Sequence, residues 1–271
     1  MKRSLWMLAL LVMASPATMA QDWWEENSAD YAPISLEVNA WMNRLDGTLQ
    51  WGTSSVPGKE MNFRDDNGLG SDTWGPYVRL NLGLSDRWTM RFSFWHIQTT
   101  GIAKPTKSLS FGGNTFAQGL DTSSDFSLDA YDILLGYKFI DGEQIDFSLL
   151  FGGGVFIPKM EMQNTANALS VERGIVPTPQ VGLGMDVSLT KGLLFRSQIV
   201  GFALDCNDAN GQQFDAEAAI NATIFQGCYI TAGYKFFKAD VDFSNNTDSA
   251  AQGDKADFNL QGPFFGLGFV F

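Results

Sequence analysis

The chain has few of the residue types that build disulfide scaffolds, metal centres and salt-bridged soluble surfaces. It contains 2 cysteines and 1 histidine in 271 residues, and 18% of its residues are charged. Cys206 and Cys228 are too few for a disulfide framework, and their spacing matches no metal motif. The charged fraction is below the roughly 25% that is common in soluble domains. We therefore expect no metal site and no cofactor.

Basic residues are also scarce. The chain has 18 lysines and arginines against 30 acidic residues, which gives a net charge of -12. Binding to nucleic acid through bulk charge needs the opposite sign, so no nucleic-acid partner is expected.

Long apolar runs are missing beyond the first twenty residues. Lys2 and Arg3 precede a short apolar core, and the small-residue pattern Thr18-Met19-Ala20 follows it. This order predicts a secretory signal peptide over residues 1–20, because the apolar part is too short to span a membrane as a helix. No later segment reaches the roughly 18 apolar residues that a spanning helix needs. The exported chain is therefore soluble, or it crosses a membrane as strands.

Aromatic residues and glycine are abundant, whereas proline is not: the chain has 22 Phe, 8 Trp, 6 Tyr, 28 Gly and 9 Pro. This composition favours β structure. In PYVRLNLGLSDRWTMRFSFW, apolar and polar residues alternate on both sides of the turn 85–87. Strict alternation predicts a hairpin with one apolar and one polar face.

The same pattern recurs along the chain, separated by short turns and longer loops. Strands are predicted at 33–45, on both sides of residues 85–87, and at 126–139, 145–157, 178–190, 193–205, 212–225, 228–241 and 258–271. We predict an all-β, transmembrane, antiparallel up-and-down β-barrel of about ten strands, with eight or twelve as alternatives. Residues 46–73 and 100–125 leave room for further pairing.

The lengths of the connections favour a barrel in a bacterial outer membrane, because such barrels have short periplasmic turns and longer extracellular loops. An even strand number places both termini on the periplasmic side. We expect residues 21–32 to form a periplasmic segment and residues 33–271 to form the barrel. A secreted lipocalin-like barrel is the alternative. Aromatic residues near the short turns favour the membrane, because they would form a girdle at its surface: Trp88, Tyr137, Phe139, Phe195, Phe225 and Tyr229.

Several stretches carry a family likeness: WMNRLDGTL, FRDDNGLG, PYVRLNLGLSDRW, LSFGGNTFAQG and the terminal GPFFGLGFVF. The chain resembles a family of small Gram-negative outer-membrane β-barrel proteins, many of which have no assigned activity. The resemblance implies that the barrel-assembly machinery reads the C-terminal strand. The residues that would carry that signal alternate along it: Phe265, Leu267, Phe269 and Phe271.

The inward face of the predicted strands carries both signs of charge. In a narrow barrel these side chains can pair and fill the interior, or they can line a small polar pore that passes polar solutes. The predicted lumen-lining residues are Glu37, Arg79, Arg91, Asp132, Lys138, Asp146, Asp186, Arg196, Asp215, Glu217 and Lys235.

His96 is the one histidine. Outer-membrane acyl hydrolases, palmitoyl transferases and omptin-type proteases resemble one another in relying on a histidine near the extracellular rim, and His96 lies near the corresponding end of its predicted strand. Alternation, however, places His96 on the lipid face beside the inward Trp95, and Gln98 stands where a nucleophilic serine would be sought. We therefore name no catalytic residue.

Two loops are rich in acidic residues and glycine, RDDNGLGSD at 64–72 and DCNDANG at 205–211. Ala209 and Asn210 break the calcium-loop pattern in the second, and the first is typical of turns. Cys206 and Cys228 fall at opposite ends of the predicted barrel, so no disulfide between them is expected.

Three functions follow from these features. The first is a small passive channel or a structural component of the outer membrane. The second is a rim-active enzyme that uses His96, and the third is a protein that binds an extracellular partner through its loops. Membrane lipids and the assembly machinery are the expected partners.

Overall fold

The strands of the chain form a closed β-barrel. The computed structural model describes residues 34–52, 58–165, 169–206, 209–242 and 254–271, with the side chains of 204–206 and 209 excluded. The predicted signal peptide and N-terminal segment lie outside these residues. The barrel strands are β1 (Ile34–Gln50), β3 (Asp72–Gly83), β4 (Trp88–Ala103), β7 (Thr122–Asp141), β8 (Ile145–Asn164), β10 (Val176–Thr190), β11 (Leu193–Cys206), β12 (Ala209–Phe225), β13 (Cys228–Asp242) and β14 (Lys255–Val270).

All ladders in the barrel are antiparallel, and consecutive barrel strands are neighbours. β8 pairs with β10 in this order, and the pairing of the last strand, β14, with the first, β1, closes the ring. Closure leaves no open sheet edge in the membrane, where unpaired backbone groups are costly. The predicted ten-stranded up-and-down barrel is confirmed. In the part of the chain that the structure describes, no helix is long and apolar enough to cross a membrane.

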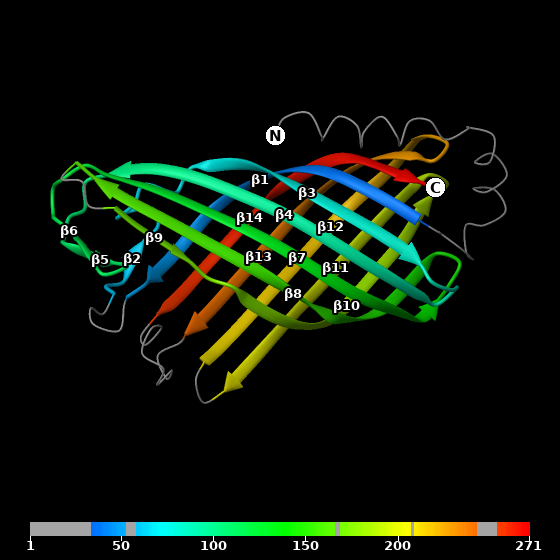
Figure 1. Cartoon of the computed structure of the whole chain (residues 1–271). Coiled ribbons are helices and arrows are strands. Elements are labelled where there is room, and N and C mark those ends of the chain that lie inside the picture. The colour runs from blue at the N-terminus through cyan, green and yellow to red at the C-terminus, as the bar shows by residue number, and fades with distance from the viewer. Residues whose placement is uncertain (1–33, 53–57, 166–168, 207–208, 243–253) are drawn as a thin grey trace.

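Short turns and the C-terminus share one end of the barrel, which we call the turn end (Figure 1). Gly192 and Gly227 have φ of 86° and 71°, a conformation that glycine adopts without steric cost, and each lies in a tight turn. The terminal Phe271 donates its backbone N–H to the carbonyl of Ile34 at 3.0 Å. The last strand is therefore paired to its final residue.

The other end, which we call the loop end, carries additional strands. They are β2 (Met61–Asn62), which pairs with β1, β9 (Leu169–Arg173), which pairs with β8, and the separate hairpin of β5 (Leu109–Phe111) and β6 (Asn114–Phe116). The hairpin is tied to the first loop by two backbone hydrogen bonds, Lys59 N–H to Ser110 at 3.1 Å and Gly112 N–H to Trp51 at 3.2 Å. The described parts of the connections that carry these strands thus form a structured cap.

The barrel strands are longer than predicted. For example, the strand expected at 126–139 runs from Thr122 to Asp141, and that expected at 145–157 runs to Asn164. The sequence pattern obscured these extensions, because the apolar residues change sides along each strand. In β7, Ile133 faces outward with 52% exposure, whereas Phe126 and Leu128 point inward and are buried.

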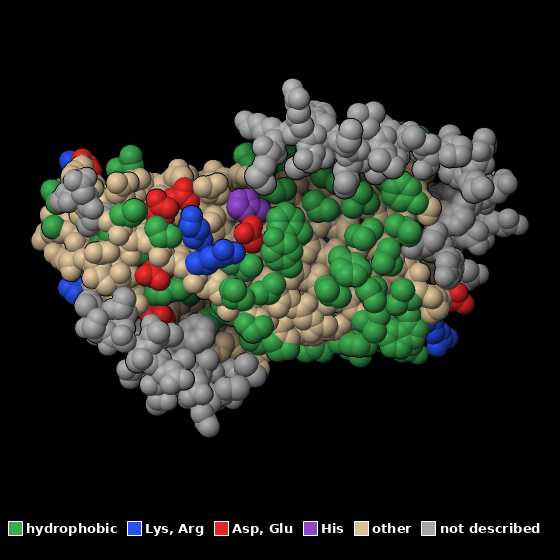
Figure 2. All heavy atoms as spheres, in the orientation of Figure 1, with side chains coloured by type: hydrophobic (Ala, Val, Ile, Leu, Met, Phe, Trp, Pro, Cys, Tyr) green, Lys and Arg blue, Asp and Glu red, His purple; other side chains and the backbone are tan. Residues whose placement is uncertain are grey.

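The outer surface therefore has two zones. From the turn end to about the middle of the strands it is apolar. Figure 2 shows one face of this surface, where hydrophobic side chains cover the part toward the turn end and charged side chains gather toward the loop end. We call the first zone the apolar belt; its exposed members include Val38, Ile133, Leu149, Leu183, Ile230 and Leu267. Its width and continuity fit a membrane-spanning barrel.

Two glycines in β14 make room for inward side chains. A Cβ on Gly268 would lie 2.0 Å from Cζ of Tyr229, and a Cβ on Gly266 would lie 2.5 Å from Oδ1 of the inward Asn39. Tyr229 points into the barrel and is 8% exposed, so its predicted place in the aromatic girdle is wrong. The girdle is nevertheless present around Trp88 and Tyr137, whose ring centroids are 4.9 Å apart.

Replacing Gly268 by alanine should destabilise the barrel by about 1–3 kcal/mol, because the new methyl group overlaps the Tyr229 ring. Gly184→Ala is the matched control, since its Cβ would meet Leu150 at an ordinary 3.6 Å. Urea unfolding in detergent micelles measures both variants. Equal stability of the two would contradict the crowding.

Asp254 anchors the cap, because its carboxylate accepts a hydrogen bond from Gly52 N–H at 2.8 Å. Burial raises the pKa of Asp254 to about 6, although this hydrogen bond works in the opposite direction. The native state therefore keeps a proton that the unfolded chain loses near pH 4. This contribution to stability is fully present below pH 4 and is lost as the pH rises through about 6.

We expect Asp254→Asn, which mimics the neutral acid, to match the wild type at pH 4 and to be relatively more stable at pH 7. The difference between their urea midpoints across this pH range measures the effect. A difference independent of pH would contradict it.

Candidate functional site

Four charged side chains meet inside the barrel and form the ion-pair quartet: Glu37, Arg79, Arg196 and Glu217. They come from β1, β3, β11 and β12, respectively. Arg79 contacts Glu217 at 2.6 Å and Glu37 at 3.6 Å. Arg196 contacts Glu37 through both nitrogens, one of them at 2.9 Å, and Glu217 at 3.4 Å. Each arginine thus bridges both glutamates.

The quartet crosses the lumen. β13 and β14 separate β12 from β1 on one side of the ring, and β4, β7, β8 and β10 separate β3 from β11 on the other. The side chains of Arg79 and Glu37 are 0% exposed, and that of Arg196 is 8% exposed. A buried charge needs a partner, because removal of one member of such a pair costs about 3–5 kcal/mol.

Two tyrosines complete the coordination of the carboxylates. Tyr77 donates its hydroxyl to Glu217, and Tyr229 donates to Glu37 at 2.8 Å. The guanidinium of Arg79 also lies 5.2 Å from the ring centroid of Tyr77 and donates to its hydroxyl. The sequence did not identify either tyrosine as a lumen residue. Tyr77 nevertheless lies on the same side of β3 as the predicted Arg79, and Tyr229 lies on the same side of β13 as the predicted Lys235.

A second buried pair joins Lys235 and Asp215 on neighbouring strands β13 and β12. The ammonium of Lys235 lies 5.1 Å from the ring centroid of Tyr77 and 6.0 Å from that of Trp41. These rings begin the apolar part of the interior. The pair therefore marks the boundary between polar and apolar fillings.

The remaining predicted lumen residues lie around the quartet or toward the turn end. Arg91 bonds Asn81 at 2.8 Å and also Gln198, and Asp132 accepts from Gln180 at 2.7 Å and from Ser93 at 3.1 Å. The partners of these two residues were not anticipated, because neutral amides and hydroxyls give no charge signal. Lys138 lies 3.3 Å from Asp146 near the turn end. Asp186 stands opposite Arg196 in the register of β10 and β11.

Beyond the quartet, toward the loop end, the lumen is filled by an aromatic core. Its largest members are at most 3% exposed: Trp41, Phe63, Trp95, Phe126, Phe156, Phe237 and Phe258. The rings meet edge to face, as Trp95 does with Phe237 at 5.0 Å and Trp41 with Trp95 at 5.4 Å. Leu109, Phe111 and Phe116 from the β5–β6 hairpin extend this core into the cap. The interior therefore has two different fillings in series.

His96 lies on the outer wall, where the apolar belt ends (Figure 2). Its Nδ1 is 2.7 Å from Asp129, and the two side chains are 34% and 36% exposed. Trp95, the preceding residue, points inward and is 1% exposed. The arrangement orients the imidazole, but among the described residues no serine, threonine or cysteine hydroxyl or thiol hydrogen-bonds to it.

The acidic loop at 64–72 forms local turns. Asn62 accepts the backbone N–H groups of Arg64 and Asp65, and Asp66 accepts that of Asn62. No group of three or more potential metal ligands occurs in the described part of the chain. The thiol of Cys228 is free, whereas the side chain of Cys206 lies outside the described residues.

Comparison with known proteins supports the fold and little more. No family model and no curated protein sequence matches the chain. The structure is similar to the outer membrane protease OmpT from Escherichia coli, with a TM-score of 0.56 and 6% identity over 90% of this chain and 98% of that one. It also matches the translocator domain of autotransporter NalP from Neisseria meningitidis, with a TM-score of 0.48 and 11% identity over 91% and 92% of the two chains. Outer membrane protein OprG from Pseudomonas aeruginosa matches with a TM-score of 0.40 and 13% identity over 89% and 97%.

At 6% identity, the likeness to OmpT shows a shared barrel architecture and carries no information about activity. Together with the apolar belt, it identifies the chain as a transmembrane β-barrel.

Replacing Glu217 by glutamine should destabilise the barrel by about 3 kcal/mol, because Arg79 and Arg196 then share one carboxylate instead of two. Asp72→Asn is the control: it removes the partner of Arg44 in an exposed pair at 2.7 Å, where solvent makes the loss small. Urea unfolding in micelles compares the two variants. Equal effects would show that the quartet carries no special weight.

Proposed function

We propose that this chain is an outer-membrane barrel with a closed lumen, which acts as a structural membrane component and holds its loop end at the cell surface. The observation that carries this proposal is the filled interior. Arg79 and Glu37 are buried at the level of the quartet, and Trp95 and Phe237 are 1% exposed in the core above it. A passive channel for polar solutes needs a continuous water-filled path through the lumen. The ion-pair quartet and the aromatic core both block such a path.

The placement in the outer membrane and its sidedness belong to the same proposal. The apolar belt supports contact with membrane lipids, and the signal peptide predicted over residues 1–20 supports export. The turn end, where the C-terminus lies, would face the periplasm. The outward Phe265, Leu267, Phe269 and Phe271 would then present the terminal strand to the barrel-assembly machinery.

A loop-mediated binding function is compatible with this architecture and gains some support from the cap. Its hairpin is anchored by side chains as well as backbone, since Asn114 donates to the carbonyl of Leu169 at 3.0 Å. A surface held in this way is suited to recognition, because little ordering is required on binding. The enzyme alternative has only the His96–Asp129 contact in its favour.

Conductance in planar bilayers tests the proposal. We expect the refolded wild type to insert without steady ion conductance. A combined variant that truncates both fillings, Glu217→Ala with Phe237→Ala, should conduct if it folds, because both residues lie inside the barrel.

Heat-dependent migration on gels checks folding of each protein. Stable, ohmic current steps from the wild type would contradict a closed lumen and restore the channel hypothesis. Asp72→Asn is the control, because its side chain lies outside the barrel. This variant should stay closed, which shows that a substitution alone does not open the lumen.

A further inference from the structure

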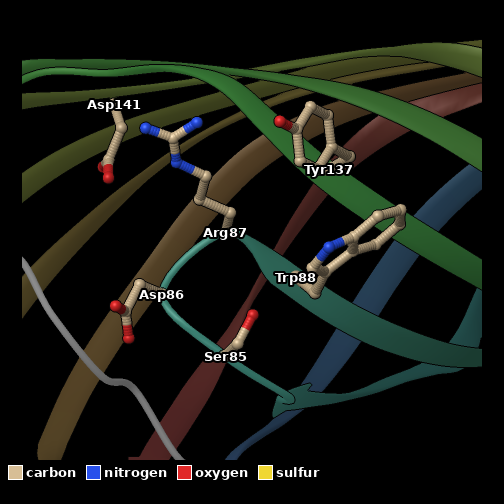
Figure 3. A pocket seen from close by; sticks show the side chains of 6 residues that line it. All are labelled: Ser85, Asp86, Arg87, Trp88, Tyr137 and Asp141. Carbon is tan, nitrogen blue, oxygen red and sulfur yellow. The ribbon is translucent and has the colours of Figure 1, made fainter.

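A pocket of about 520 Å³ opens at the turn end of the barrel. It is lined by the β3–β4 turn and by the end of β7: Ser85, Asp86, Arg87, Trp88, Tyr137 and Asp141. Figure 3 shows Arg87 extended from the turn toward β7, which carries Tyr137 and Asp141. Neither the ion-pair quartet nor the aromatic core contributes to this pocket.

The backbone that forms the pocket is held in place by hydrogen bonds. Ser85 and Trp88 exchange two backbone hydrogen bonds of 3.2 Å across the turn, and the N–H of Lys138 donates to the carbonyl of Arg87 at 2.8 Å. The second contact ties the turn to β7. The charged side chains of the pocket therefore start from a fixed scaffold.

The pocket carries both signs of charge, and much of that charge is not neutralised within the protein. In the described part of the chain, neither Arg87 nor Asp86 forms an ion pair within 4.0 Å. Asp141 contacts Lys138 at 3.7 Å through one carboxylate oxygen. The guanidinium of Arg87 and the carboxylate of Asp86 are therefore available to a ligand, and Asp141 keeps acceptor capacity.

The position of the pocket restricts what can occupy it. Trp88 packs against Tyr137 and, at 6.0 Å between centroids, against Phe151 of the apolar belt. Tryptophan and tyrosine side chains prefer the level of lipid headgroups. A group bound beside them would therefore belong to a lipid whose acyl chains lie along the belt.

We infer that the pocket binds the headgroup of a zwitterionic phospholipid with a primary ammonium, such as phosphatidylethanolamine. Arg87 would donate to the phosphate, because guanidinium suits phosphate geometry. Asp86 and Asp141 would accept hydrogen bonds from the ammonium, and the rings of Trp88 and Tyr137 would pack against the same cation. Phosphatidylcholine lacks the ammonium protons, and phosphatidylglycerol lacks the cation. The inference depends on the barrel spanning a membrane and not on its lumen being closed.

Native mass spectrometry of the full mature barrel, released from micelles that contain short-chain phosphatidylethanolamine, phosphatidylcholine or phosphatidylglycerol, tests the site. We expect the wild type to retain phosphatidylethanolamine in preference to the other two lipids. Arg87→Gln should weaken that retention about tenfold, because a charge-assisted hydrogen bond is lost. Asp86→Asn should reduce the discrimination against phosphatidylglycerol.

Lys191→Gln is the matched control, since Lys191 occupies the β10–β11 turn at the same end of the barrel and does not line the pocket. Equal retention of the three lipids by the wild type would overturn the proposal. Unchanged retention by Arg87→Gln, or an equal loss in Lys191→Gln, would overturn it as well. The result is independent of conductance, so a failure here leaves the closed lumen standing, and the reverse also holds.

Discussion

The contacts between two arginines and two glutamates across the lumen set the conditions for the rest of this structure. Glu37 and Arg79 come from one wall of the barrel, and Arg196 and Glu217 from the opposite wall. Four buried charges are tolerable only while every member is paired, so the register of four strands must keep their side chains at one level. The phenols of Tyr77 and Tyr229 satisfy further carboxylate lone pairs. The glycine at position 268 follows from this constraint, since it leaves space for Tyr229.

The reversal of polarity along the barrel is the second organising feature. In the belt, apolar side chains face outward and charges face inward, as lipid surroundings require. Toward the loop end this arrangement is inverted, and the barrel is built like a soluble domain with an aromatic interior. The change occurs between Tyr131 and Ala130 in β7 and between Phe94 and Trp95 in β4. His96 and Asp129, on the outer wall, are among the first polar residues beyond it.

Much of the fold could be predicted from sequence, because alternation with period two fixes which residues share a face. The short turns were found at their places, and the pairing of the first strand with the last followed from closure. Strand length was underestimated, because the apolar residues move from the outer to the inner face partway along a strand. The alternation is broken at that point, and the sequence beyond it looks like a loop. Phe126 and Leu128 illustrate this, because they lie in the same strand as the outward Ile133 but face the other way.

The contents of the lumen were harder to predict. Parity placed Glu37 and Glu217 on the inner face, but no local pattern says which arginine reaches which glutamate across a barrel. Tyr229 was assigned to the girdle from its place near a turn, whereas its hydroxyl bonds Glu37 inside. Neutral partners such as Gln180 and Gln198 have no charge pattern that would identify them. Pairing across the lumen depends on tilt and stagger, which a single sequence does not specify.

A double-mutant cycle on Glu37 and Arg196 tests the central claim most directly, because these residues join opposite walls and share two contacts. The two single variants, Glu37→Gln and Arg196→Gln, and the double variant would be unfolded in urea under identical micelle conditions. The structure predicts a coupling energy of at least about 1 kcal/mol, within the range that contacting charges show. Additive effects, with coupling below about 0.3 kcal/mol, would contradict an ion-pair quartet that spans and closes the lumen.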